Sequence, residues 1–576
     1  MTEPKVFRSF LTSRDAMSLC LCGGVAAVLA LYQLGQRPLL DAESRYALIA
    51  YEMLRSADWI QPRLNTFPYY EKPPLLYWAI ALSYQVFGVG EFASRLPCAL
   101  AHVGTTVLVF TLARALLGRG AGVFAGLIYA TAAGPLIFAR TSFPDGLLVF
   151  WLTLSLLGLT QTIRGKGGWV LFYVGAAAAG LSKGFVGLLL PFGAAATYGL
   201  VAHDFKIISR LRPGWGALIL FSVFLPWHVA LAARDLAFVH FYIVNEHIYR
   251  FLNVREPVDS VPLSVVGFWI SSLFWLLPWS LFLPGALLWI REGAAPLALP
   301  LIWSVIVIGF FSLARSRLEK YGLPALPALA IVIGGYWRGL VEHSRRTAEM
   351  TLPALLVAVV GMGMFSLVAV TLPMSGALTS LLAALDGHYR EHSDEALLLT
   401  GGFVRLAQPF SILLLVLGVS TYVAARAGRA WLSFLLWVAL LVPVSQFVNR
   451  ANHLVASNRS QRDAAEMITR DWEDGARVVV DGLYDDAMSV TFYTRRPTYI
   501  LDGNSTDLAF GFRHAGGSPL LLTSDQFDDY WRSPRRLFLL TDRRPFPARA
   551  YVLLDRPHFA LVTNRPRGLR AAEPER

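Results

Sequence analysis

The chain has 576 residues, of which 55% are hydrophobic and 16% are charged, and its net charge is +12. This composition excludes an average soluble protein, and three cysteines, Cys20, Cys22 and Cys98, are too few for a disulfide framework. The apolar residues come in runs of about twenty, enough to cross about 30 Å of hydrocarbon as helices. We therefore interpret the chain as a polytopic α-helical membrane protein whose positive charge suits contact with anionic lipid.

Hydropathy predicts about thirteen membrane spans. Their approximate limits are 16–35, 94–117, 121–138, 146–163, 169–181, 184–202, 215–232, 264–290, 297–314, 322–337, 351–372, 409–425 and 431–447. Short connections rich in Lys and Arg, for example at Arg114, Arg119, Lys206 and Arg429, fall on the side of the amino terminus, which the positive-inside rule makes cytoplasmic. An odd number of spans then places the carboxyl end outside. The first run is predicted to be an uncleaved span, because it lacks a convincing cleavage site.

The first outer segment, residues 36–93, concentrates charge beside the membrane. Asp41-Ala-Glu-Ser-Arg45 leads into apolar residues at helical spacing, which predicts an amphipathic helix on the membrane surface. Tyr69-Tyr-Glu-Lys-Pro-Pro74 follows, and the apolar stretch 74–87 predicts a second interfacial helix. Ionisable groups beside a bilayer are costly unless paired or wet, so they are candidate functional residues. Asp41 is also explained as a helix N-cap.

Later outer loops add charge to the same face. The segment 233–263 contains Phe241-Tyr-Ile-Val-Asn-Glu-His-Ile-Tyr-Arg-Phe251, and Lys320 and Tyr321 lie in a further loop. A third long outer loop is predicted at 373–407. Two interpretations of the many outer cations stay open: pairing with nearby acids or lipid phosphates, and a cleft for a phosphorylated substrate.

The residues from 449 onward have shorter apolar runs and more Arg, Asp and Pro. Buried strands are predicted at 478–480, 537–540, 551–554 and 559–562, with a helix at 462–471 before the first of them. We expect a transmembrane domain at 1–448 and a small soluble α/β domain at 449–576 on the periplasmic side. This domain contains no Walker loop, no dinucleotide-binding glycine pattern and no Cys/His zinc pattern.

Several short motifs occur together in residues 1–340. They are Asp41-x-Glu43-x-Arg45-Tyr46, Asp58-Trp59, Tyr69 with Glu71-Lys72-Pro73-Pro74, Ser94-Arg95-Leu96-Pro97, Pro144-Asp145, Ser182-Lys183-Gly184 and Lys320-Tyr321-x-Leu323-Pro324. This combination resembles the lipid A aminoarabinose transferases and, more broadly, the protein O-mannosyltransferase-like members of the glycosyltransferase C superfamily.

The resemblance implies a glycosyltransferase of the bacterial inner membrane with its active site facing the periplasm. It would move a sugar such as 4-amino-4-deoxy-L-arabinose from undecaprenyl phosphate to a lipid A phosphate or another envelope acceptor. We expect a monomer with no nucleic-acid partner. The expected catalytic residues are Asp41, Glu43 and Asp145. The expected substrate-binding residues are Arg45, Tyr46, Tyr69, Lys72, Arg95, Lys183, Arg250, Lys320 and Tyr321.

Several roles stay open at this point. A hydroxyl acceptor would need Asp41 or Asp145 as general base, whereas a phosphate acceptor is already anionic. The resemblance also implies a divalent metal, zinc, at Glu71 and His247, although two protein ligands make an incomplete zinc site. His247 is otherwise explained as an interfacial histidine paired with Glu246 or Glu71. Lys320 and Tyr321 are equally explained as interfacial anchors.

Three rival functions are considered. A protein O-mannosyltransferase is the close enzymatic alternative. A polyprenyl-linked sugar transporter is disfavoured because charge gathers in the outer loops rather than at the midplane of the membrane. An O-antigen ligase or polymerase would not be expected to carry the early Asp-x-Glu loop.

Overall fold

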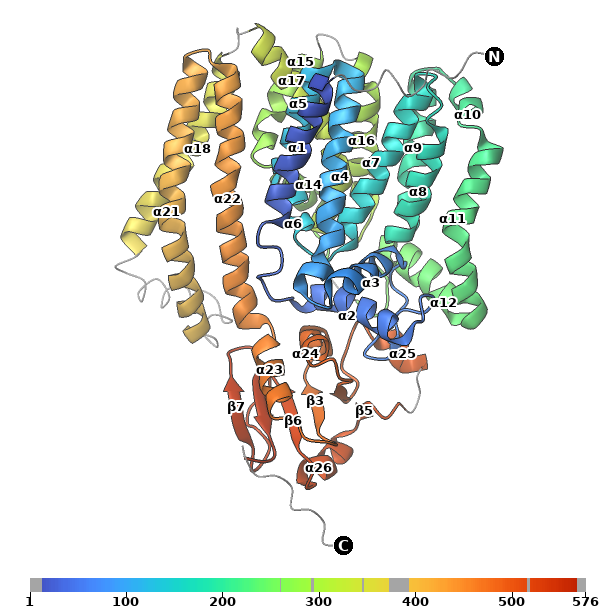
Figure 1. The fold of residues 1–576 in the computed structure, drawn as a ribbon, viewed down its shortest axis with the longest axis vertical. Helices are drawn as coiled ribbons and strands as arrows, with labels where there is room; N and C mark the ends of the chain where they lie inside the picture. The colour runs from blue at the N-terminus through green and yellow to red at the C-terminus, as the bar shows by residue number, and fades with distance from the viewer. Residues whose placement is uncertain are drawn as a thin grey trace.

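The computed structural model describes residues 13–258, 261–291, 295–343, 347–371, 393–514 and 518–566. A bundle of membrane helices is followed by a small α/β domain (Figure 1). We call it the exported domain, after the location that the sequence predicts for it. Helix α1 (Ser13–Leu31) begins at the end of the bundle opposite to this domain (Figure 1). This arrangement is the one expected from an odd number of crossings.

The membrane helices follow the predicted spans in order. They are α1, α4 (Glu91–Leu117), α5 (Arg119–Thr131) with α6 (Ala133–Ala139), α7 (Pro144–Ile163), α8 (Trp169–Lys183), α9 (Val186–Val201), α11 (Pro213–Arg234), α14 (Val265–Trp275) with α15 (Leu283–Ile290), α16 (Ala298–Leu313), α17 (Leu326–His343), α18 (Thr347–Thr371), α21 (Ser393–Arg426) and α22 (Ala430–Arg459). Within the described ranges, eight helices are long and apolar enough to cross a membrane, or up to ten if each bent pair is one span. The polytopic fold class is confirmed, whereas the count of thirteen stays a prediction.

Two interfacial helices connect the first span to the second. Helix α2 (Asp41–Ser56) and helix α3 (Leu75–Phe87) are joined by a hairpin of β1 (Arg63–Leu64) and β2 (Phe67–Pro68). Leu40 occupies the N-cap position of α2, so Asp41 is the first helical residue rather than the cap. The side chain of Asp41 lies outside the described part of the structure.

The other outer segments are more helical than expected. The second one folds as α12 (Ala237–Val239), η1 (His240–Tyr249), which has π-helical hydrogen bonds, and α13 (Arg250–Leu252). A 3-10 helix, η4 (Glu319–Ala325), contains Lys320 and Tyr321. Short helices α10 (Lys206–Arg210), η2 (Trp279–Phe282) and η3 (Ala295–Leu297) complete the membrane part.

Two predicted boundaries differ from the structure. Helix α21 already begins at Ser393 and fills the last part of the predicted loop 373–407, while residues 372–392 lie outside the described ranges. Helix α22 continues to Arg459, so the exported domain starts near Ser460 rather than at 449. The polar residues after 449 include no Gly or Pro before Ser460, and polarity alone does not end a helix that leaves the membrane.

The exported domain is built on a six-stranded sheet of order β5-β4-β3-β6-β8-β7. Strands β3 (Arg477–Asp481), β4 (Tyr499–Leu501), β5 (Leu521–Leu522) and β6 (Leu537–Thr541) are parallel, and β7 (Tyr551–Asp555) and β8 (Ala560–Thr563) are antiparallel additions. Its helices are α23 (Arg462–Arg470), α24 (Met488–Thr494), α25 (Ala509–His514) and α26 (Ser524–Arg532), with the 3-10 helix η5 (Tyr484–Asp486). The predicted α/β class, its four strands and its first helix are therefore confirmed.

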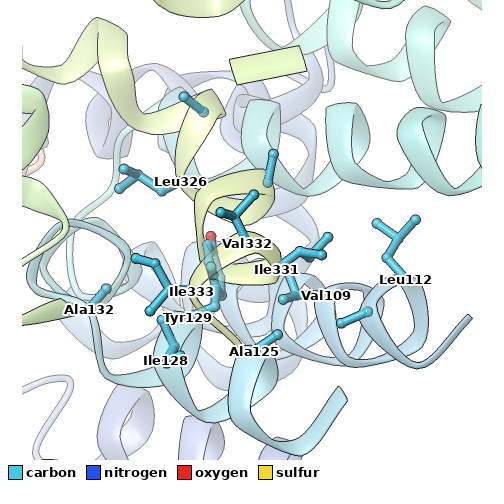
Figure 2. Packing of buried hydrophobic residues seen from close by; sticks show 14 of the residues in the cluster. Val109, Leu112, Ala125, Ile128, Tyr129, Ala132, Leu326, Ile331, Val332 and Ile333 are labelled. Carbon is cyan, nitrogen blue, oxygen red and sulfur yellow. The ribbon is translucent and has the colours of Figure 1, made fainter. Parts of the chain in front are cut away.

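The core of the membrane part lies where α4, α5 and α17 pack together. Figure 2 shows Val109, Ile128 and Ile331 from these three helices among the buried side chains. A second buried cluster extends from Tyr77 and Ile80 of α3 to Val480 and Leu540 of the exported sheet. Because one apolar core includes both parts, the exported domain is docked firmly against the interfacial helices.

Polar contacts fix the same joint. The Asn65 side chain donates to the Thr498 carbonyl at 2.7 Å and accepts from the Thr498 amide at 2.9 Å. Both residues are buried. Helix α24 packs on α2 (Figure 1), so the exported domain lies directly over the charged first outer segment.

Candidate active site

A cavity of about 510 Å³ lies where the outer segments meet the ends of the membrane helices. It is lined by Arg45, Tyr46, Glu71, Lys72, Pro144, Asp145, Lys183, Phe185, Val186, Leu189, Glu246, His247, Ile248, Arg250, Phe251, Leu252, Phe310, Phe311, Ala314, Ser316, Leu318, Lys320 and Tyr321. Most of the site residues expected from the sequence are in this list. The fold therefore brings together motifs from the first outer segment, from α7 and α8, and from both later loops.

Glu246, a buried residue of η1, is the centre of a cationic cluster. Its carboxylate lies 3.0 Å from Lys72 Nζ and 3.0 Å from Arg250 Nη2, and it also pairs with Arg255. Burial alone would raise the pKa of Glu246, but Lys72, Arg250 and Arg255 lower this pKa well below its usual range. The ionised carboxylate holds the cations at the cavity wall.

Glu71 extends this network toward α2. Its Oε1 pairs with Arg255, and its Oε2 accepts from the Tyr69 hydroxyl at 3.0 Å. Arg45 Nη1 donates to the same hydroxyl at 3.3 Å and lies 3.9 Å from Glu71 Oε2. Tyr69 is absent from the cavity lining, but it holds two side chains that are part of it.

Asp507 of the exported domain reaches the same network and pairs with Arg45. The loop before it is fixed by Asp485, whose carboxylate accepts from the Thr506 amide at 2.8 Å. Burial raises the pKa of Asp507 to about 7, against the opposing effect of Arg45. The sequence did not indicate this contact, because 462 residues separate the two partners.

The cavity lining also contains a second charge pair and a further lysine. Asp145, in the first turn of α7, pairs with Lys183, in the last turn of α8. Both termini suit their charges, because a helix favours an acid at its start and a base at its end. Lys320 Nζ lies 5.1 Å from the centre of the Phe143 ring and makes no ion pair or hydrogen bond with any described residue.

Besides Tyr69, two expected site residues with described side chains lie outside the cavity lining. Arg95 and Glu43 are buried and form a two-armed ion pair, with Nε to Oε1 and Nη2 to Oε2 both at 3.0 Å. Arg37 adds a 2.7 Å contact to Glu43, and Arg95 also donates to backbone carbonyls at the end of the first span. Neither Glu43 nor Arg95 lines the cavity. Their geometry is that of a brace between the first outer segment and α4.

The two residues expected to hold a metal both line the cavity, yet their donor atoms are engaged. His247 Nδ1 lies 2.6 Å from the Tyr242 carbonyl, and its Nε2 accepts from the Phe185 amide at 3.2 Å. Burial lowers the pKa of His247 to about 4, so the ring is neutral. Among the described residues, no group of three or more His, Cys, Asp or Glu is placed to hold a metal ion. The residues present in this arrangement do not fit a metal site.

One wall of the cavity is apolar and opens toward the outside of the bundle. It is formed by Phe185, which directly precedes α9, by Val186 and Leu189 of α9, by Phe251 and Leu252, and by Phe310 and Phe311 of α16. Leu189 is 54% exposed and Leu252 is 43% exposed, which places the edge of this wall on the outer surface of the helices. The cavity lining thus combines cations with apolar side chains, as an amphiphile with an anionic headgroup requires.

Comparison with known proteins identifies the class. Residues 71–229 match the family described as dolichyl-phosphate-mannose-protein mannosyltransferase. The fold is that of ArnT from Cupriavidus metallidurans, crystallised with undecaprenyl phosphate, with a TM-score of 0.78 and 23% identity over 95% of this chain and 98% of that one. The chain therefore has the fold of a membrane glycosyltransferase, which is the architecture expected from its motifs.

More similar sequences define the family. The undecaprenyl phosphate-alpha-4-amino-4-deoxy-L-arabinose arabinosyl transferase of Pseudomonas aeruginosa (strain UCBPP-PA14) is 29% identical over 500 residues, which are 82% of each chain. Its counterpart in Edwardsiella ictaluri (strain 93-146) is 30% identical over 420 residues, 69% of this chain and 71% of the relative. The chain belongs to this family of aminoarabinose transferases, which confirms the resemblance seen in its motifs.

Proposed function

We propose that this protein transfers 4-amino-4-deoxy-L-arabinose, or a similar sugar, from undecaprenyl phosphate to a phosphate of lipid A. The observation that carries the proposal is a cavity whose lining combines cations with apolar side chains; the cations are Arg45, Lys72, Lys183, Arg250 and Lys320. A polyprenyl tail would lie on the apolar side chains while its phosphosugar head meets the cations. The names of the family members supply the sugar and the carrier.

The reaction replaces one bond at the anomeric carbon of the sugar. The bond from this carbon to the donor phosphate oxygen breaks, and its electron pair stays on the departing undecaprenyl phosphate. An oxygen of the acceptor phosphate forms the new bond. Negative charge grows on the leaving phosphate, so cations held at the cavity wall favour the transition state over the ground state.

Lys320 suits the leaving phosphate best, because it has no carboxylate partner to give up. Lys72 and Arg250 are held in place by Glu246, which reduces the reorganisation needed when charge develops.

The acids have different tasks under this proposal. A phosphate acceptor is already anionic, so no general base is needed, and Asp145 beside Lys183 orients the sugar or its amino group. Tyr46 and Tyr321 shape the sugar pocket. Asp41, at the start of α2, becomes the general base only in the alternative reaction with a hydroxyl acceptor. Glu43, Arg95 and Tyr69 act by positioning the first outer segment.

The proposed location is the bacterial inner membrane, with the cavity facing the periplasm. The location is inferred from basic connections such as those at Arg119 and Lys206. By the positive-inside rule, the side of the membrane that holds these connections is cytoplasmic. The exported domain is at the other end of the bundle (Figure 1). The cavity is lined by residues of the predicted outer segments, among them Lys72, Arg250 and Lys320. A divalent ion between Glu71 and His247 would require the Arg255 pair and the Phe185 hydrogen bond to open, so we assign it no step.

Mass spectrometry of lipid A from cells with and without the gene tests the function. A gain equal to one aminopentose per modified phosphate is expected, and the modified fraction must decrease in a Lys320→Met variant that still inserts. An unchanged lipid A profile, together with newly glycosylated envelope proteins, would overturn the proposed acceptor. That outcome would favour the hypothesis of a protein O-mannosyltransferase, which the family match over residues 71–229 supports.

A further inference from the structure

A second cavity, of about 450 Å³, lies in the joint between helix α2, the β1-β2 hairpin and the segment that joins α24 to β4. Four guanidinium groups line it: Arg55 from α2, Arg63 from the hairpin, and Arg495 and Arg496 from the exported domain. We call this cavity the arginine groove. None of its lining residues belongs to the candidate active site.

The four arginines of the groove are not neutralised by protein acids. No described carboxylate lies within 4.0 Å of any of them, whereas most cations of the active site are paired with acids. Arg63 donates to the Gln61 side chain at 2.7 Å, and Arg495 donates to the Val89 carbonyl at 3.1 Å. Arg496 lies 3.8 Å from the centre of the Trp472 ring. These neutral contacts orient the guanidinium planes and leave their charge for a ligand.

Among the described residues, Glu52 is the only carboxylate that lines the groove, and it interacts with Arg63 and Arg55 without forming an ion pair. Glu52 accepts a hydrogen bond from the Thr66 amide at 3.0 Å. Burial raises the pKa of Glu52 to about 7, so this group is only partly ionised near neutral pH. Clustered guanidinium groups without acids are the preferred partners of phosphates and carboxylates, which they bind in two-armed geometry.

Helix α2 connects the groove to the active site. Arg45 lines the active-site cavity, and Glu52, seven residues later on the same face of the helix, lines the groove. At 1.5 Å per residue, about 10 Å separates these positions along the helix. A headgroup made of several sugars is long enough to span that distance.

The groove is also set back from the bilayer. Helix α3 packs against α2 on one side, and α24 of the exported domain packs against α2 on the other (Figure 1). Packed helices lie about 8–10 Å apart, so the groove is one helix layer beyond α3 on the side of the exported domain. The headgroup of a phospholipid stays at the bilayer surface, whereas sugars attached to a lipid extend outward from it.

We propose that the arginine groove binds phosphate- or carboxylate-bearing sugars attached to the lipid acceptor, while the phosphate to be glycosylated occupies the active-site cavity. This proposal rests on the proposed function, because it assigns a recognition site to the acceptor of that reaction. It makes the exported domain part of acceptor selection.

The test compares two acceptors with protein in phosphatidylcholine nanodiscs. One acceptor is lipid A alone, and the other is lipid A that carries anionic sugars. For the unaltered protein we expect a KM about tenfold lower for the second acceptor, as about 1.4 kcal/mol of added contact gives. The double variant Arg55→Gln/Arg496→Gln should lose this preference, with kcat and the donor KM unchanged. Arg549→Gln is the matched control, because this exposed arginine precedes β7 at the far edge of the sheet from β4.

Binding of inorganic pyrophosphate, measured by calorimetry, gives a readout without turnover. One binding site should disappear in the double variant and remain in Arg549→Gln. Equal KM values for the two acceptors in all three proteins, with pyrophosphate binding unchanged, would overturn the groove while leaving the transferase function intact. A preference that appears only when phosphatidylglycerol is added to the nanodiscs would assign the groove to phospholipid headgroups and also overturn the proposal. Loss of transfer to both acceptors in the unaltered protein would count against the proposed function, and pyrophosphate binding would still decide the groove.

Discussion

Lys320→Met removes the cation that has no acidic partner in the part of the active site that the structure describes. Because no carboxylate is left unpaired, the change should not disturb the fold. Two unit charges 4 Å apart interact by about 4 kcal/mol at an effective dielectric constant of about 20, and by about 1 kcal/mol in bulk water. Lys320 is half-buried, so its effect falls between these limits. At about 1.4 kcal/mol per tenfold change in rate, kcat should fall by about 5- to 1000-fold.

The assay is transfer by purified protein in nanodiscs, with undecaprenyl-phosphate aminoarabinose as donor and lipid A as acceptor. Lys320→Arg should keep most of the rate, because it retains the charge. Lys206→Met is the matched control, since Lys206 is an exposed cation in α10, at the other end of the bundle. If Lys320→Met kept kcat within twofold of the unaltered protein, leaving-group stabilisation by this lysine would be refuted.

Three further outcomes are expected. Asp507→Asn should lower transfer by about tenfold and flatten its pH profile. In the unaltered protein, the raised pKa of Asp507 means that its carboxyl gains a proton as pH falls from 8 to 6, which weakens the pair with Arg45 and lowers the rate. A pH profile unchanged by the variant would contradict this. Arg95→Met breaks a buried ion pair, which typically costs about 3–5 kcal/mol. Thermal denaturation should therefore show a large loss of stability. A stable but inactive variant would instead indicate that Arg95 takes part in the reaction. Incubation with EDTA followed by dialysis should leave the transfer rate unchanged, and recovery only on adding zinc would restore the metal hypothesis.

The general architecture could be predicted from the sequence because its signals are local. Runs of apolar residues define the spans, and helical spacing after Arg45 defines α2. The strands around Val479 and Leu539 are buried on both faces, and they appear as short continuous apolar runs. Strands β4 and β5 were missed because three and two residues carry too little pattern. The end of α22 was also missed, since the sequence changes character before the helix ends.

The candidate site could be predicted in part, for a different reason. Arg45, Lys72 and Asp145 belong to recognisable short motifs, and all three line the cavity. Glu246 and Asp507 belong to no such motif, and only the folded chain brings them to the same network as Arg45 and Lys72. Long-range ion pairs of this kind depend on how separate elements pack, which the spacing of residues along one chain does not encode.

The arrangement of these ion pairs indicates different roles for the acids and the cations of the cavity. Each described acid of the cavity network is bound to at least one cation: Glu246 to Lys72, Arg250 and Arg255, and Asp145 to Lys183. The cations lower the pKa of Glu246, so its carboxylate has a low affinity for protons and is a poor general base. We infer that these acids mainly set the positions of cations. Such an arrangement suits a reaction in which the acceptor brings its own negative charge and the difficult step is the departure of a phosphate.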